Sequence, residues 1–94
     1  MAANVVAVPL PASSGVIPGV DPGQLHGLVV RETAGAAATV LIREGSNSGT
    51  ILAARSLAAN QAETIWLGEI GVDVISPYFH LVAGAAAGSV LVSI

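Results

Sequence analysis

Turn-forming residues recur along this chain at intervals of roughly eight to twelve residues, and this spacing constrains the fold more than any other feature. Between the turns lie short runs rich in valine, isoleucine and threonine, which are typical of β-strands. Such runs after residue 24 are 25–33, 37–44, 50–58, 63–67, 72–76, 78–83 and 89–94. Apolar residues nowhere keep a 3.6-residue spacing over about eleven residues, although a short helix at 58–62 stays open. The pattern predicts an all-β fold, an antiparallel β-sandwich or jelly-roll-like structure of about seven or eight short strands.

The first 24 residues differ from the remainder because they hold four of the five prolines, Pro9, Pro11, Pro18 and Pro22. Proline fixes φ and donates no backbone hydrogen bond, so we expect an extended segment. We therefore divide the chain into an extended N-terminal arm, residues 1–24, and a β-sandwich body, residues 25–94. Within the arm, Asn4 to Val8 could form an edge strand or lie on a neighbouring chain, and a frayed terminus is the third alternative.

Charge and cysteine content exclude several functional classes. Of the 94 residues, 53% are hydrophobic and 10% are charged, and the formal net charge is −3. The basic residues are three arginines, which is too few for a nucleic-acid-binding surface or for a patch that binds anionic membranes. The uncharged stretches at the two ends are interrupted by proline and glycine, so we expect no signal peptide and no membrane-spanning helix. Without cysteine there is no disulfide framework and no thiol nucleophile.

No motif in the chain carries catalytic or metal-binding chemistry. His26 and His80 are the two histidines, and neither lies in an H-x-H or H-E-x-x-H pattern, so we predict no metal and no cofactor. A G-x-S-x-G nucleophile elbow is missing, and the acidic residues Glu69 and Asp73 flank a turn. We therefore predict that the protein is not an enzyme.

The aromatic and charged side chains of the body are expected to serve the fold. In small β domains the few aromatic residues usually belong to the core, so we expect Phe79, Leu81 and Trp66 to point inward. Arginine and glutamate side chains are expected to pair across strands. The candidate pairs join Arg31, Arg43 and Arg55 to Glu32, Glu44 or Glu63.

Three stretches of the body carry a family resemblance. They are LHGLVVRETAGAAATVLIREG, SLAANQAETIWLGEIG and YFHLVAGAAAGSVLV. Together they resemble small all-β structural proteins of tailed bacteriophages, of the kind that decorate the head as cement proteins. The resemblance covers about three quarters of the chain, residues 25–94, and its motifs are diffuse. It implies a virion protein on the capsid exterior that binds the major capsid protein lattice and stabilises the head. It also implies a homo-oligomer, first of all a trimer at a local threefold axis.

A shell-binding protein needs apolar contact area rather than a pocket, and the chain holds more apolar residues than a core of this size requires. Prolines lower the entropic cost of ordering an extended arm on a partner. We predict that the partner-binding residues are Val5, Val6, Val8, Pro9, Leu10, Pro11, Val16, Ile17 and Pro18. The alternative function is a phage tail, neck or adhesion module that binds another protein, or a saccharide through exposed rings. A barrel that holds a lipid or small ligand would require an internal cavity.

Overall fold

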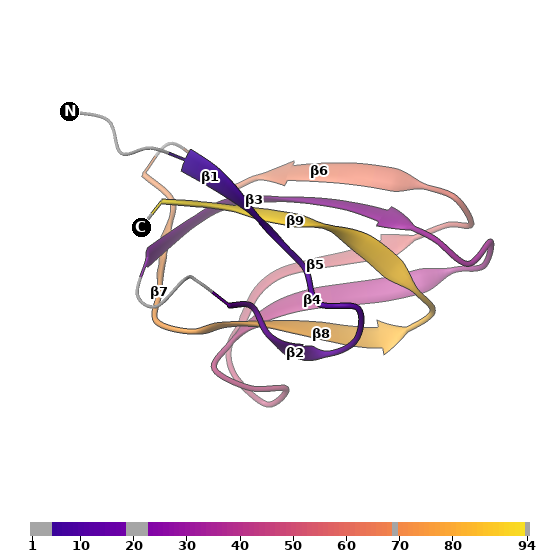
Figure 1. Ribbon diagram of the computed structural model, residues 1–94, viewed down its shortest axis with the longest axis horizontal. Coiled ribbons are helices and arrows are strands. Elements are labelled where there is room, and N and C mark those ends of the chain that lie inside the picture. The colour runs from indigo at the N-terminus through magenta and orange to yellow at the C-terminus, as the bar shows by residue number, and fades with distance from the viewer. Residues whose placement is uncertain (1–4, 19–22, 69, 94) are drawn as a thin grey trace.

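Two antiparallel sheets face each other in the computed structural model, which describes residues 5–18, 23–68 and 70–93 (Figure 1). Sheet A has the strand order β1 (Val5–Pro9), β9 (Ala86–Ser93), β3 (Gly23–Glu32), β6 (Ala62–Trp66), and β7 (Val72–Val74) also pairs with β3. Sheet B has the order β2 (Gly15–Val16), β8 (Pro77–Ala83), β4 (Ala38–Glu44), β5 (Ile51–Leu57). The all-β, antiparallel two-sheet architecture is confirmed, with nine strands over the described residues.

Strand positions follow the turn signals closely. The seven runs expected after residue 24 correspond to β3 through β9, with ends displaced by only a few residues. Residues 58–61 form a turn, where the sequence left a short helix at 58–62 open: Gln61 N donates to Ala58 O at 3.0 Å, and Asn60 takes a positive φ of 59°. A positive φ ends any helical path, so the chain reverses into β6.

The connection between β8 and β9 differs from the hairpin expected at residues 84–88. β8 belongs to sheet B and β9 to sheet A, so this short connection carries the chain from one sheet to the other (Figure 1). Gly84 has a φ of 78°, and a Cβ atom there would lie 2.5 Å from the carbonyl oxygen of Ala37. Glycine therefore meets two requirements of this crossing, a left-handed backbone and a close approach to the neighbouring chain.

The described part of residues 1–24 is not separate from the body. β1 pairs with β9 in sheet A, and β2 pairs with β8 in sheet B. Leu10 N donates to Gly88 O and Ile17 N donates to Pro77 O, both at 2.9 Å. Of the alternatives left open by the sequence, the structure has the edge strand, formed within the same chain. Proline is compatible with this arrangement because an edge strand leaves every second N–H without a ladder partner.

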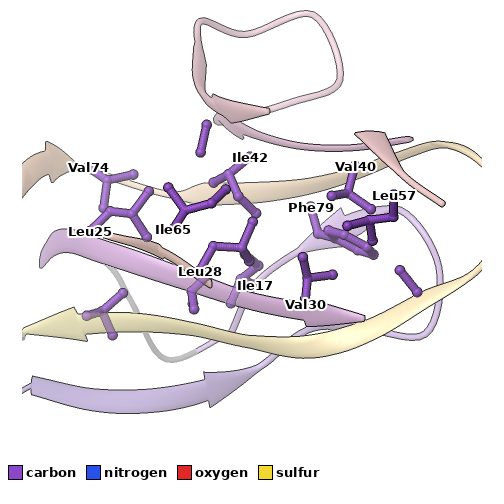
Figure 2. Close-up of a cluster of buried hydrophobic side chains, with 14 of the residues drawn as sticks. Ile17, Leu25, Leu28, Val30, Val40, Ile42, Leu57, Ile65, Val74 and Phe79 are labelled. Atoms are coloured by element: carbon purple, nitrogen blue, oxygen red, sulfur yellow. The ribbon is translucent and has the colours of Figure 1, made fainter. Parts of the chain in front are cut away.

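The core lies between the inner faces of the two sheets and includes one residue from the N-terminal segment. Figure 2 shows Ile17 among the apolar side chains of β3, β4 and β8. Ile17 is 1% exposed and packs inside its own chain, so in this fold its side chain is not on the surface that a partner would contact. The other core members are Leu25, Leu28, Val30, Ala38, Val40, Ile42, Ala53, Leu57, Ile65, Val74, Phe79, Ala86, Val90 and Val92. No helix among the described residues is long and apolar enough to cross a membrane.

A bulge in β3 changes which of its residues face the core. The pairing of β3 with β9 shifts between Leu25 and Gly27, so His26 is an extra residue on the β3 side. The bulge lets Leu25 and Leu28 both point inward although they are three positions apart, because it changes the phase of the alternation. It also turns the His26 side chain toward the end of sheet A, where the polar network described below begins.

Candidate interaction surface

The nine residues predicted to bind a partner do not form one continuous site. Val5, Val6, Val8 and Pro9 lie in β1 at the edge of sheet A, whereas Val16 lies in β2 at the edge of sheet B. Pro9 and Pro18 are exposed, Pro11 is half-buried, and Val8 and Leu10 pack against the core. The strand β1 therefore supplies the largest exposed part of the predicted set, and Val16 is exposed on the other sheet.

A second exposed apolar surface lies on the outer face of sheet A, and strand register defines it. One row across the sheet runs Trp66, Gly27, Leu91, Ala7, and the next runs Thr64, Val29, Ser89, Pro9. Ala62, Arg31 and Ala87 form a third row. We call these three rows the Trp66 face. Arg31 is the one charged residue in them, so the face offers apolar and small polar groups.

Trp66 lies at the β6 edge of this surface, and its indole leans over the glycine opposite it. The indole is 54% exposed, so the expectation that it points inward is wrong; Phe79 is fully buried as expected, and Leu81 packs against the core. A Cβ atom on Gly27 would lie 3.3 Å from Trp66 Cε3 and 3.3 Å from Leu91 Cδ1. Both side chains therefore lie over the backbone of Gly27. The alternation in β6 contained the signal, because a buried Ile65 requires that Trp66 face outward.

A polar network under Trp66 holds the end of sheet A together. His26 is 3% exposed and its ring stacks on the indole of Trp66, with ring centroids 6.0 Å apart. His26 Nδ1 lies 3.1 Å from Gly68 O, and Nε2 lies 2.9 Å from Ser93 Oγ. Ser93 Oγ donates to Gln24 Oε1 at 3.0 Å, and Gln24 Nε2 donates to Asp73 Oδ1 at 3.2 Å. The network joins β3, β9, β7 and the loop after β6.

The acceptor in one of these bonds fixes its donor. The carbonyl of Gly68 can only accept, so His26 Nδ1 is the donor of that bond. The Ser93 hydroxyl donates to Gln24 Oε1 and lies against His26 Nε2. Together the bonds hold the His26 ring stacked on the Trp66 indole, at an interplanar angle of 27°.

The pairing of Ser93 with His26 has the composition of a catalytic dyad but not its accessibility. Ser93 is 2% exposed, and its hydroxyl hydrogen is engaged with Gln24. A nucleophile must reach the substrate and pass its proton to the histidine, and neither is possible in this arrangement. The geometry is that of a structural network.

The two histidines do not come together, because His26 belongs to sheet A and His80 to sheet B. His80 Nδ1 accepts a hydrogen bond of 3.0 Å from Arg43 Nε, and Arg43 Nη1 donates to Gly49 O at 2.8 Å. Across the described ranges there is no group of three or more histidine, aspartate or glutamate side chains that could hold a metal ion. Arg43 thus has partners other than the expected glutamates.

The glutamates expected to pair with arginine instead bind backbone amides. Glu44 accepts from Ile75 N and Ser76 N, both at 2.9 Å. Glu32 accepts from Asn60 N and Gly35 N, both at 2.8 Å, and from Ala34 N. The Asn60 bond, supported by the bonds from residues 34–36, holds the pKa of Glu32 below its ordinary value, although burial opposes this shift. Each carboxylate therefore fastens a loop to the sandwich.

Comparison with known proteins adds no relative to this description. No protein-family model matches the chain, and neither the curated proteins nor the solved structures contain a match.

Proposed function

We propose that the protein is a non-enzymatic structural component of a phage virion. It binds the major capsid protein lattice on the outside of the head as a homo-oligomer. The sequence resemblance to decoration proteins supports this assignment. Among the structural observations, the Trp66 face carries it, because a protein that covers a repeating shell needs a broad apolar contact rather than a cavity.

Exposure and charge are the features that make the Trp66 face suitable. Trp66 is 54% exposed and Val29 is 40% exposed, and the adjoining β1 adds Val5 at 44%. The outer face of sheet B is more polar, with Arg43 and His80 hydrogen-bonded to each other on it. Aromatic residues dominate the energetics of protein interfaces, and their centres are depleted of charge. In this proposal Trp66 therefore contributes most to the contact with the shell.

The proposal is tested by sedimenting the purified protein with empty shells assembled from the major capsid protein of the same phage. Trp66→Ala is expected to weaken co-sedimentation by about tenfold or more, the usual cost of removing a central aromatic residue. Val82→Ala is the matched control, because Val82 is 51% exposed on β8 of the other sheet and its loss is expected to change little. Circular dichroism checks that both variants fold. Equal binding by wild type and both variants would overturn the assignment of this surface.

The alternative of saccharide binding has one observation in its favour, the exposed indole of Trp66 over an apolar surface. A flat ring of this kind can stack on a sugar. Glycan binding by the wild type that is lost in Trp66→Ala, together with no binding to shells, would favour the adhesion module over the decoration protein.

A further inference from the structure

The outer edge of β1 is an open row of backbone hydrogen-bonding groups. β1 is the last strand of sheet A, and its register on β9 pairs Val6 with Val92 and Val8 with Val90. Leu10 N donates to Gly88 O, so the even-numbered residues direct their backbone groups toward β9. In an antiparallel ladder successive residues alternate in direction. The backbone groups of Val5, Ala7 and Pro9 therefore point away from the sheet.

Pro9 lies at a position where its missing N–H costs nothing in the fold. Because it is one of the outward-directed residues, it removes no bond to β9. The open edge thus presents N–H and C=O groups of Val5 and Ala7 and the C=O of Pro9. Water bonds to this set when the edge is free, and another extended strand would pair with it in register.

Charge distinguishes β1 from the other edge strands. β5 carries Arg55, β6 carries Glu63 and β7 carries Asp73, and charges of this kind protect an edge from pairing with a copy of itself. β2 is uncharged but only two residues long. β1 has five residues and no charged side chain, and its protection is limited to Pro9 at its last position. Since a twofold axis brings identical residues together, an uncharged edge is the one suited to self-association.

We propose that two copies of this chain pair antiparallel through β1 about a twofold axis at Ala7. In this register Ala7 faces Ala7 of the second copy, Val5 faces Pro9, and Val6 faces Val8. The two Ala7 residues exchange two hydrogen bonds, and each Val5 N–H donates to the Pro9 carbonyl of the other copy. Every residue of β1 then faces a residue of the other copy, and the Val5 carbonyl, opposite Pro9, is the one outward group without a ladder donor. Val6, which is 41% exposed, gains a valine neighbour on the inner face of the extended sheet.

This twofold assembly names the self-partner of the proposed homo-oligomer, and it favours a dimer over the trimer implied by the family resemblance. It also makes a geometric prediction about Ala7. Residues that exchange both hydrogen bonds have Cα atoms about 5.5 Å apart, which lies within the range that a disulfide bridges. The chain contains no cysteine, so a single introduced cysteine can form a disulfide only with the same position of a second copy.

The experiment uses the purified full chain without shells, so its result is independent of capsid binding. Under mild oxidation in native buffer, the folded Ala7→Cys variant is expected to form a covalent dimer. Thr64→Cys is the matched control: Thr64 is exposed on the same outer face of sheet A, on the opposite edge strand β6, and is expected to remain monomeric. Circular dichroism of both reduced variants checks the fold.

Sedimentation velocity of the wild type over about 0.01 to 1 mM is expected to show a reversible monomer–dimer equilibrium. Ala7→Lys places two like charges opposite each other and should raise the dimer dissociation constant by about tenfold or more, whereas Thr64→Lys should leave it unchanged within error. A strictly monomeric wild type, a trimer, or an Ala7→Cys variant that forms no dimer on oxidation would each overturn the proposal.

Discussion

Replacing Ile17 tests whether the N-terminal segment belongs to the fold of its own chain. The side chain is 1% exposed and lies among the core residues, with its backbone N–H bonded to Pro77 O. Ile17→Ala removes three carbon atoms, which corresponds to about 2.4 kcal/mol of transfer free energy at 0.8 kcal/mol each, and the cavity left behind adds to this cost. We expect a loss of about 3 to 4 kcal/mol in the free energy of unfolding.

Such a loss is large for this chain. Domains of 94 residues are typically stable by about 5 to 14 kcal/mol, and each kcal/mol changes the melting temperature by about 4 to 8 °C. Urea unfolding followed by far-ultraviolet circular dichroism measures the difference. Val16→Ala is the matched control because Val16, the residue next to Ile17, is 52% exposed, and its loss should change stability by about 0.5 kcal/mol or less. Equal stability of the two variants would show that Ile17 packs elsewhere, as an arm bound to a partner would require.

Four other substitutions test the loops and the polar network. Gly84→Ala and Gly35→Ala both place alanine at a φ of 78°. A Cβ atom has open space at Gly35, whereas at Gly84 it meets backbone atoms of the neighbouring chain segment. Thermal melts should show a loss of stability of about 1 kcal/mol for Gly35→Ala and a clearly larger loss for Gly84→Ala. Backbone hydrogen bonds lower the pKa of Glu32 in the folded state, so its ionised carboxylate stabilises the fold. This stability is complete above the ordinary pKa of glutamate and is lost as pH falls through the pKa of the folded state. On acidification from pH 7 to about 3, the melting temperature of Glu32→Gln should therefore fall less than that of the wild type. Ser93→Ala leaves buried His26 without its Nε2 partner and should cost about 1 to 3 kcal/mol in urea unfolding, and a neutral result would contradict the network.

Local sequence signals were sufficient for the strands but not for their arrangement. Glycine, asparagine and proline mark where the backbone must turn, so the ends of β3 to β9 were predictable within a few residues. The same signals do not specify which strand the chain joins next. Residues 84–88 look like a hairpin, yet they cross between the sheets, because the partner of β9 is chosen by the burial of Val90 and Val92 against distant strands.

The surface could be predicted only in part, for a similar reason. The composition indicated exposed apolar area, and the alternation in β6 places Trp66 on the outer face, but periodicity does not reveal what surrounds the indole there. The bulge at His26 changes the phase of β3, and Gly27 leaves room for the indole across the strand. Likewise, proline content indicated an extended segment at the N-terminus, but an edge strand and an arm on a neighbour have the same local conformation. Only the pairing of β1 with β9 distinguishes them.

The two proposed interactions are geometrically coupled because both involve sheet A. The exposed area of the protein is 4963 Å², close to the roughly 5,000 Å² expected for a compact monomer of this mass. The core is therefore of ordinary size, and the excess of apolar residues lies on the surface. Opposed residues of an antiparallel pair point to the same side of a sheet. Pairing at Ala7 therefore places the two Trp66 faces side by side on one surface, with both copies of sheet B on the other.

A dimer of this kind binds a repeating shell through two faces at once, so the shell affinity should depend on the link between the copies. The Ala7→Cys variant tests this without any further change in sequence, because the oxidised and reduced forms have the same Trp66 face. The oxidised dimer is expected to leave the shell at least about 100-fold more slowly than the reduced form at a concentration where the latter is monomeric, since the second contact becomes intramolecular. Equal release rates for the two forms would show that the faces do not engage the shell together. Adding a reductant to the bound dimer should then have no effect, whereas bivalent binding requires that it accelerate release.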